Sequence, residues 1–357
     1  MSDDNYYVAS RKILGIHTNV DDFTWSYGMS MPKVTRKEYS DCRIRIRLEV
    51  LDHLVSSGSD SVGWQELTGK YHYFSGIHDQ DIIRYKRNFL FGSELQIEAK
   101  GLLTEEPHLL INKNYYKYIR FRFMNLHSIG YILTDLAGLL LLHRGYAPLH
   151  CSAFRKRDAT VVVLAPPNTG KTLSTMMACM EYGADFIAED IAITDGHMIY
   201  SVPWTSTFRY YSKVDKRHGS KVVNMFTRIL PLLELISFIK PKPFDTYIER
   251  QRLLDSAHIS HLVILERGDE SILHEAPAEI FRKVLNLNKY EFNYQKAPIA
   301  VAHEYFNPGL NIYEAGLSER EILRTMIDSA KETFIVRAKD PTQYATLILN
   351  NINSIRS

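Results

Sequence analysis

Apolar and polar residues alternate along several short stretches of the first third of the chain. The alternation is clearest in CRIRIRLEV (42–50), KYHYFSG (70–76) and YKYIRFRF (116–123), and Gly, Asp and Asn separate the runs. A period of two residues is typical of strands that bury one face. The pattern therefore predicts an antiparallel sheet from Tyr6 to about Phe123.

The period changes in ILTDLAGLLLLHRGYAP (132–148), where apolar residues fill most positions of a helix before Gly145 and Pro148 end it. The most apolar run, 129–142, contains Asp135 and is shorter than the roughly 20 residues that cross a bilayer. We therefore expect a buried helix. The change of period predicts two domains, a β-rich domain at 1–127 and a second domain at 128–357.

The second domain opens with the order of elements of an α/β nucleotide-binding core. ATVVVLA (159–165) is a β-branched run typical of a buried strand, a helix is expected from Lys171 to about Tyr182 before Gly183, and DFIAEDIAI (185–193) is a second strand. PLHCSAF (148–154) is predicted to form a hairpin with ATVVVLA. The remaining predicted elements are a strand at 262–268, a helix at 318–332, a strand at 333–338 and a final helix at 341–352 that starts at Pro341.

Composition narrows the class of protein. With 45% apolar and 24% charged residues among 357, the chain is expected to fold, and 43 basic against 41 acidic residues predict no binding to nucleic acid or to a membrane surface. Three widely spaced cysteines and an acidic N-terminus without an apolar core predict a cytoplasmic protein. The apolar segment 226–244, cut by three prolines, predicts either a helical hairpin in the core or a mobile flap over a site.

APPNTGKT (165–172) fits the Walker A pattern, with Ala165 in place of its first glycine. The pattern follows a predicted buried strand and opens a predicted helix, which is the context of a phosphate-binding loop. Backbone N–H groups at the helix start attract a phosphate, and a lysine and a threonine of this motif serve the β- and γ-phosphates and Mg²⁺. The predicted nucleotide-binding residues are Asn168, Thr169, Gly170, Lys171, Thr172 and Leu173.

Two adjacent acids interrupt the second predicted strand. Glu189 and Asp190 lie in FIAEDIAI, where a carboxylate needs a cation to offset the cost of burial. Neighbouring residues of a strand point to opposite faces, so both can face one metal only if the strand ends or bulges there. Thr172, Glu189 and Asp190 are the predicted Mg²⁺ ligands, and one of the two acids is the predicted base. His150 is expected to assist them if the hairpin register brings it to the loop.

The segments PLHCSAF, VVVLAPPNTGKT and GADFIAEDIAIT together resemble the catalytic domain of HPr kinase/phosphorylase and its serine-kinase-like relatives, which are related to ATP-dependent phosphoenolpyruvate carboxykinase. The resemblance covers about residues 129–345. It implies an α/β P-loop core in which His150, Lys171, Glu189 and Asp190 are catalytic. A glutamate stands at position 189, where the family has an aspartate.

The resemblance implies transfer of phosphate from Mg·ATP to a hydroxyl of a peptide, a protein or a small molecule, with ATP and Mg²⁺ as the cofactors. The β-rich domain would bind the substrate or a partner, and a homo-oligomer is left open. Two other functions fit the residues. One is a regulatory or assembly ATPase without phosphotransfer, and the other is a peptide-binding accessory protein with a degenerate site.

Overall fold

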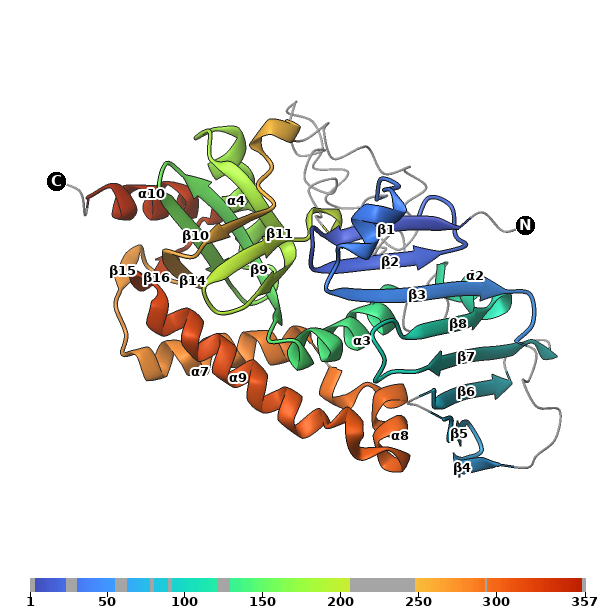
Figure 1. Ribbon diagram of the computed structural model, residues 1–357. Coiled ribbons are helices and arrows are strands. Elements are labelled where there is room, and N and C mark those ends of the chain that lie inside the picture. The colour runs from blue at the N-terminus through green and yellow to red at the C-terminus, as the bar shows by residue number, and fades with distance from the viewer. Residues whose placement is uncertain are drawn as a thin grey trace.

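The chain is a mixed α/β protein with two eight-stranded sheets. The computed structural model describes residues 4–23, 31–54, 63–77, 80–88, 92–120, 129–205, 248–292 and 294–354. The segment 226–244, for which the sequence leaves two interpretations, lies outside these residues. Figure 1 shows the sheets side by side with helix α3 between them.

The first sheet has the strand order β1-β2-β3-β8-β7-β6-β5-β4. Strands β4 to β8 form an antiparallel meander, as the alternating pattern predicts. The bounds are β1 Asn5–Ser10, β2 Leu14–Thr18, β3 Ile44–Leu51, β4 Trp64–Thr68, β5 Tyr71–Phe74, β6 Ile82–Asn88, β7 Glu94–Lys100 and β8 His108–Asn112.

The prediction that this sheet is wholly antiparallel is wrong at two places. Strand β3 is parallel both to β2 and to β8. Parallel neighbours need a crossover of a dozen or more residues. The segment 19–43, which includes helix α1 (Arg36–Ser40), is long enough to return the chain to the same end of the sheet before β3 begins. Periodicity reports the buried face of a strand but not its direction.

The strand predicted at 116–123 is also wrong within the described residues, because helix α2 occupies Lys113–Arg120. The side-chain oxygen of Asn112 accepts a hydrogen bond from the Tyr115 N–H at 3.0 Å. An asparagine oxygen that binds an N–H three residues later is typical of a helix N-cap. This local bond starts a helix in a segment whose short apolar pattern fits either period.

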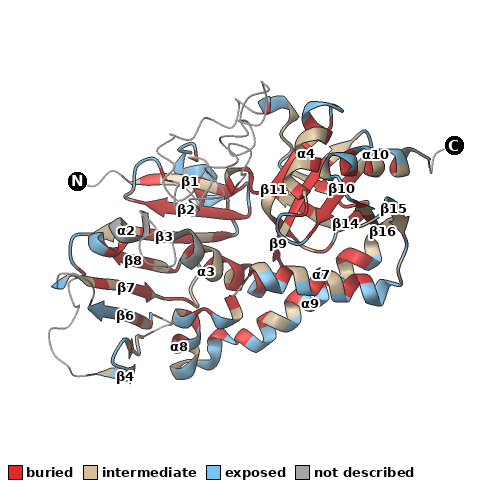
Figure 2. Ribbon diagram, turned by 180° about the vertical axis from the view of Figure 1, so that it is seen from behind, coloured by how far each residue is buried: buried red, intermediate tan, exposed pale blue. Residues whose placement is uncertain are grey.

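The second sheet is the middle of three layers, with the order β13-β12-β11-β9-β10-β14-β16-β15. Alternate residues of β10 face opposite sides: Val161 and Val163 pack with helices α4 and α10, whereas Val162 and Leu164 pack with α7 and α9. The strands are β9 Ala147–Lys156, β10 Ala159–Leu164, β11 Asp185–Thr194, β12 Met198–Ser201, β13 Ser256–His258, β14 His261–Arg267, β15 Ser271–Leu273 and β16 Glu332–Ala338. The runs of buried residues along β10 and β14, red in Figure 2, show that the interior of this sheet is buried on both faces.

The predicted elements of this half are confirmed, with shifted ends. The last predicted helix consists of a 3₁₀ turn at Pro341–Gln343 followed by α10, and α9 begins at Ile312, six residues earlier than expected, because Asn311 caps it. The bounds are α3 Ile129–His143, α4 Lys171–Met180, α7 Pro277–Glu291, α8 Pro298–Phe306, α9 Ile312–Ser329 and α10 Tyr344–Ser354.

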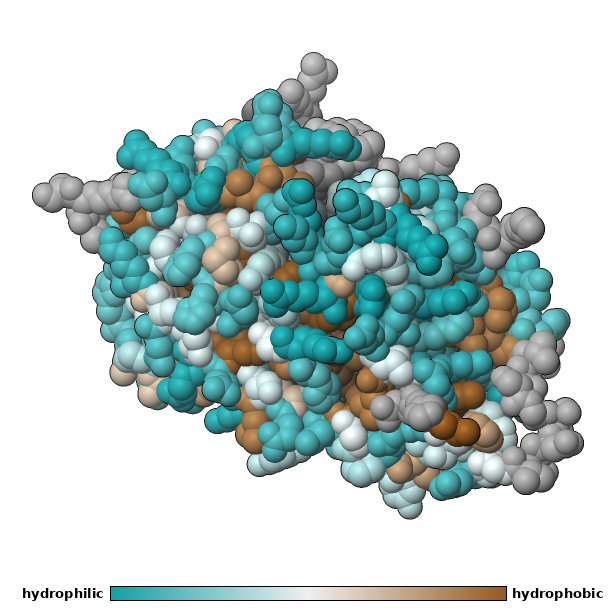
Figure 3. All heavy atoms as spheres, viewed as in Figure 1, coloured by the Kyte–Doolittle hydropathy of each residue, from teal (hydrophilic) through white to brown (hydrophobic). Residues whose placement is uncertain are grey.

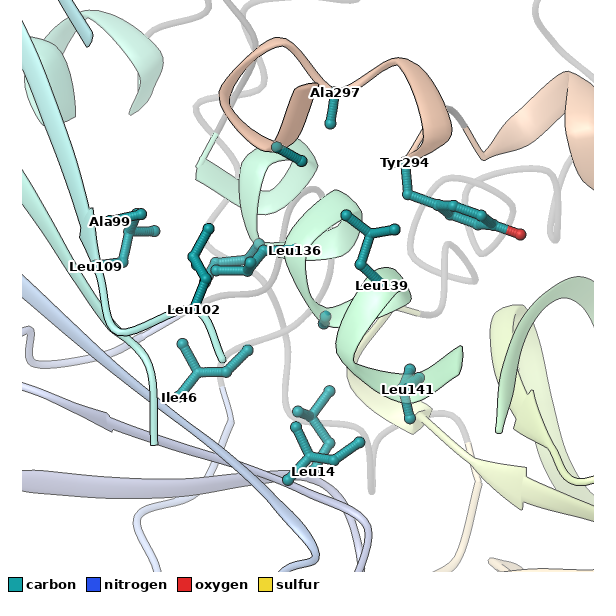
Figure 4. Packing of buried hydrophobic residues seen from close by; sticks show 14 of the residues in the cluster. Leu14, Ile46, Ala99, Leu102, Leu109, Leu136, Leu139, Leu141, Tyr294 and Ala297 are labelled. Atoms are coloured by element: carbon teal, nitrogen blue, oxygen red, sulfur yellow. The ribbon is translucent and has the colours of Figure 1, made fainter. Parts of the chain in front are cut away.

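Helix α3 is buried, as expected, and joins the two halves. Leu136 and Leu139 belong to one hydrophobic core together with Ile46 of the first sheet and Tyr294 after α7. Figure 4 shows Leu136 on the side of α3 that faces Ile46 and Leu139 on the side that faces Tyr294. Helix α8 packs on β5 and β6. The division into domains 1–127 and 128–357 stays a prediction, and residues from both ranges share this core.

In the part of the chain that the structure describes, every helix is too short or too polar to span a bilayer. The face seen in Figure 3 is largely hydrophilic, with smaller hydrophobic areas between the polar side chains.

The half-buried Asp135 of α3 yields a test of this packing. Burial raises the pKa of Asp135 to about 7, so the folded state binds a proton that the unfolded state releases near pH 4. Stability contributed by the protonated form is complete below pH 4 and is lost as the pH rises to about 7. Asp135→Asn should therefore raise the free energy of unfolding by on the order of 1 kcal/mol at pH 8 and change it little at pH 4. Urea unfolding at both pH values measures this, and an equal effect at both would contradict it.

Candidate functional site

The candidate site lies where β10 ends and α4 begins. β10 runs parallel to β14 in the interior of the sheet, ends at Leu164, and is joined by a loop at 165–170 to the helix that starts at Lys171. Ligands of α/β proteins bind outside the carboxyl ends of such strands. The strand, loop, helix and following strand β11 therefore occur in the predicted order.

Two residues with positive φ shape the loop. Asn168 has φ 60° and Gly170 has φ 123°, conformations that are uncommon for residues with a side chain. The guanidinium of Arg267, at the end of β14, donates a hydrogen bond to the Asn168 carbonyl at 2.9 Å. A β-carbon on Gly170 would lie 2.7 Å from Cβ of Pro341. The loop is thus held from outside by β14 and by the turn before α10.

The first turn of α4 has backbone N–H groups without a partner inside the helix. The N–H of Ser174 makes the first helical bond, to the Gly170 carbonyl at 2.9 Å, so α-helical bonding leaves out the N–H groups of Lys171, Thr172 and Leu173. Gly170 caps the helix without a side-chain bond. The Thr169 N–H contacts the Pro166 carbonyl at 3.3 Å. A helix start of this kind attracts anions.

The Lys171 side chain is buried and lacks a partner. The residue is 8% exposed, and its Nζ makes no hydrogen bond within the described ranges. An ammonium group taken out of water without a partner costs several kcal/mol. An anion beside Nζ would offset that cost.

Thr172 and Glu189 are brought together. The Thr172 hydroxyl donates to Oε1 of Glu189 at 2.5 Å, and Glu189 is 1% exposed. The Thr205 hydroxyl lies 3.5 Å from the Glu189 carbonyl. The ring nitrogen of Trp204 donates to the Val8 carbonyl of β1 at 3.0 Å. The turn at Pro203–Thr205 therefore connects the first sheet with the strand that carries the acids.

The second acid occupies an irregular position in the strand. Asp190 has φ 84°, and the pairing of β11 with β9 shifts register between Phe186 and Ala188. Burial, followed by the charge of Glu189, raises the pKa of Asp190 to about 6, while Lys171 acts in the opposite direction. The register shift precedes the two acids, which pair regularly with Ser152 and Cys151. The positive φ of Asp190 is the departure from strand geometry at the acids themselves.

His150 lies at the loop end of the sheet. Ser152 pairs with Val163, so the hairpin register carries His150 past Leu164 to the level of the loop, and on the other side His150 pairs with Ile191. Its Nδ1 is 3.4 Å from Oε1 of Glu291. The Cys151 thiol is fully buried, and burial raises its pKa to about 12.

Sequence reasoning missed two residues of α7 that contact His150. The Asn288 side chain accepts a hydrogen bond from the His150 N–H at 3.2 Å and donates one to the Pro148 carbonyl at 3.1 Å. Glu291 is the last residue of the same helix. Asn288 and Glu291 are 138 and 141 positions away from His150 in the sequence. Local sequence patterns therefore carry no signal for these contacts.

These side chains supply only part of the ligands that a hard cation needs, so water or a substrate phosphate would have to supply the others. No group of three or more His, Cys, Asp or Glu side chains in the described ranges is arranged to hold a metal ion. Mg²⁺ is commonly bound through one or two carboxylates, with water and substrate phosphates as the other ligands. The Thr172 hydroxyl with Glu189 suits that partial set.

Comparison with known proteins leaves the family open. No protein-family model and no curated protein sequence matches the chain. One solved structure similar in part is the HPr(Ser) kinase/phosphatase from Coxiella burnetii, which is 10% identical. The match covers 34% of this chain and 66% of that chain, just under two thirds, with a TM-score of 0.21. A likeness of this degree is too slight to assign an activity.

Gly170 gives a test of the loop geometry, and Gly183 gives its control. Both have positive φ, but a β-carbon on Gly183 would meet only the flexible end of Lys156 at 3.6 Å. Gly170→Ala should lower the free energy of unfolding by about 2 kcal/mol or more, because the clash with Pro341 adds to backbone strain, whereas Gly183→Ala should cost about 1 kcal/mol. Chemical denaturation compares the two variants. Equal losses would show that Pro341 does not restrict the loop.

Proposed function

We propose that this protein is a Mg·ATP-dependent kinase that transfers the γ-phosphate to a hydroxyl group. The observation that carries the proposal is the buried ammonium of Lys171, which makes no hydrogen bond among the described residues and lies in the first turn of α4, where the first N–H groups have no partner within the helix. A polyphosphate would place negative charge next to the Lys171 ammonium and next to the N–H groups at the start of α4. The irregular acidic strand beside the helix supports the same assignment.

The chain's own residues would hold the nucleotide at the start of α4. The N–H groups of Lys171, Thr172 and Leu173 would bind phosphate oxygens, and the Lys171 ammonium would neutralise charge on the β- and γ-phosphates. Arg267 keeps the loop in this shape through the Asn168 carbonyl. Preformed donors of this kind stabilise charge in the transition state without reorganisation.

Mg²⁺ when bound would neutralise developing charge on the β- and γ-phosphates. Thr172 and Glu189 are the residues proposed to hold it, because their side chains are already in contact and one of them is an acid. The hydrogen bond from the Thr172 hydroxyl to Glu189 keeps both oxygens in place before the ion arrives. Asp190 then remains as the residue proposed for proton transfer.

The proposed reaction is a single displacement. The Asp190 carboxylate takes the proton of the acceptor hydroxyl, the acceptor oxygen forms a bond to the γ-phosphorus, and the bond from that phosphorus to the β–γ bridging oxygen breaks, so that ADP leaves. His150 assists at the same end of the sheet. The acceptor is proposed to be a hydroxyl of a peptide, a protein or a small molecule.

Lys171→Ala tests the nucleotide site. Loss of the ammonium should weaken ATP binding and reduce phosphotransfer at least about 100-fold, because a preorganised charge at the phosphates is removed. The control is Lys113→Ala, which alters an exposed lysine paired with Asp52 on the first sheet's side. Calorimetry measures ATP binding, and labelled ATP with clarified lysate reports any phosphorylated acceptor.

The wild-type protein separates the three candidate functions in the same assay. Release of ADP and free phosphate without a labelled product would favour a regulatory ATPase. Failure to bind ATP at millimolar concentration would favour a peptide-binding accessory protein. Normal phosphotransfer by Lys171→Ala would overturn the assignment of the site.

Glu189→Gln and Asp190→Asn should have different effects. The first should raise the Mg²⁺ concentration required for half-maximal rate, because a charged ligand is lost. The second should lower kcat by about 100-fold or more, with a smaller change in Mg²⁺ requirement, because the base is lost. The exposed Glu181, at the end of α4, provides the control Glu181→Gln. Rates at varied Mg²⁺ decide, and a fully active Asp190→Asn variant would exclude that residue as the base.

A further inference from the structure

Helix α7 contacts both the backbone and the ring of His150. Asn288 and Glu291 are three residues apart and therefore lie on one face of the helix. Asn288 binds the N–H of His150 and the carbonyl of Pro148, and Glu291 lies 3.4 Å from the ring nitrogen Nδ1. Asn288 therefore binds the backbone at this point, while Glu291 is a close ion-pair neighbour of Nδ1, which makes no hydrogen bond within the described residues.

The face of α7 that carries Asn288 is also bound to helix α9. Asn288 is 1% exposed and also donates to Oε1 of Glu319 at 2.7 Å, and Glu319 of α9 is itself 1% exposed. A buried amide with all three bonds made cannot rotate without leaving polar atoms unpaired. Asn288 therefore fixes the position of α7 along β9, and with it the position of Glu291 next to His150.

Glu291 is ionised where it meets the ring. The interaction with His150 holds the pKa of Glu291 below its usual range, and Lys171 adds to the effect. A carboxylate accepts hydrogen bonds but does not donate them. When the imidazole is neutral, the ring nitrogen next to such an acceptor carries the proton.

We propose that Glu291 is a positioning residue that keeps the proton of neutral His150 on Nδ1 and leaves Nε2 as the ring nitrogen available to the site. The proposal rests on the proposed kinase function for its purpose, but the tautomer itself depends only on the geometry of α7 and β9. With Nε2 unprotonated, His150 can accept a hydrogen bond from an acceptor hydroxyl or from a bound water. Glu291 acts through the histidine and need not contact a substrate.

The tautomer can be measured without any substrate. Nitrogen-15 NMR of histidine-labelled full-length protein at pH 8 distinguishes the two neutral tautomers, and the signals of His150 are those absent from a His150→Gln sample. The wild-type protein should show predominantly the Nδ1–H form. Glu291→Gln should shift His150 toward the Nε2–H form, and Glu291→Asp should retain part of the preference.

The control is Glu279→Gln on the same helix, where the carboxylate is exposed and paired with Arg282. It should leave the His150 signals and the activity unchanged. With an identified acceptor, Glu291→Gln should lower kcat by about 10- to 100-fold, as loss of a residue that orients a functional histidine does elsewhere, with ATP affinity retained.

Unchanged His150 signals in Glu291→Gln would overturn the proposal whatever the activity. A wild-type protein that shows the Nδ1–H form but transfers no phosphate would instead overturn the proposed function and leave the role of Glu291 in setting the tautomer intact.

Discussion

The structure of the candidate site depends on one electrostatic constraint: a lysine ammonium is buried at the positive end of a helix. The positive charge of the ammonium and the positive end of the helix dipole lie together there. In the described part of the chain, Nζ of Lys171 has no hydrogen-bond acceptor. Glu189 and Asp190 supply negative charge on the neighbouring strand, but the Thr172 hydroxyl occupies one oxygen of Glu189. An anionic ligand at this place would complete the arrangement, and this is the link between the fold and the proposed phosphate chemistry.

The second sheet and the helices on its faces maintain this arrangement. Two helices cover each face of the sheet, so the strands that end at the site are fixed on both sides. Strand β11 carries Glu189 beside Thr172, and the next acid, Asp190, has a positive φ. The turn at Pro203–Thr205 relates this strand to β1 of the first sheet through Trp204. Two of the non-glycine residues with positive φ, Asn168 and Asp190, lie next to the candidate ligands.

Local signals explain which features the sequence could predict. β10, the loop and α4 could be located because a β-branched run, Gly-Lys-Thr and a helical period occur within 25 residues. The direction of the strands in the first sheet could not be predicted, because β3 pairs with β2 and with β8, which are distant from it in the sequence. Helix α2 depends on a single cap at Asn112. Glu291 could not be predicted either, because its relation to His150 exists only after α7 has packed on the sheet.

The close approach of Gly170 to Pro341 has a consequence for the order of folding. The loop reaches its final shape only against a turn 171 residues later, and Tyr344, next to that turn, is fixed by hydrogen bonds from its hydroxyl to the carbonyls of Glu266 and Ala338. During synthesis on the ribosome, β10 and α4 emerge long before this support exists. The loop and the start of α4 should therefore reach their final arrangement late in biogenesis, after β14, β16 and the start of α10 have come together.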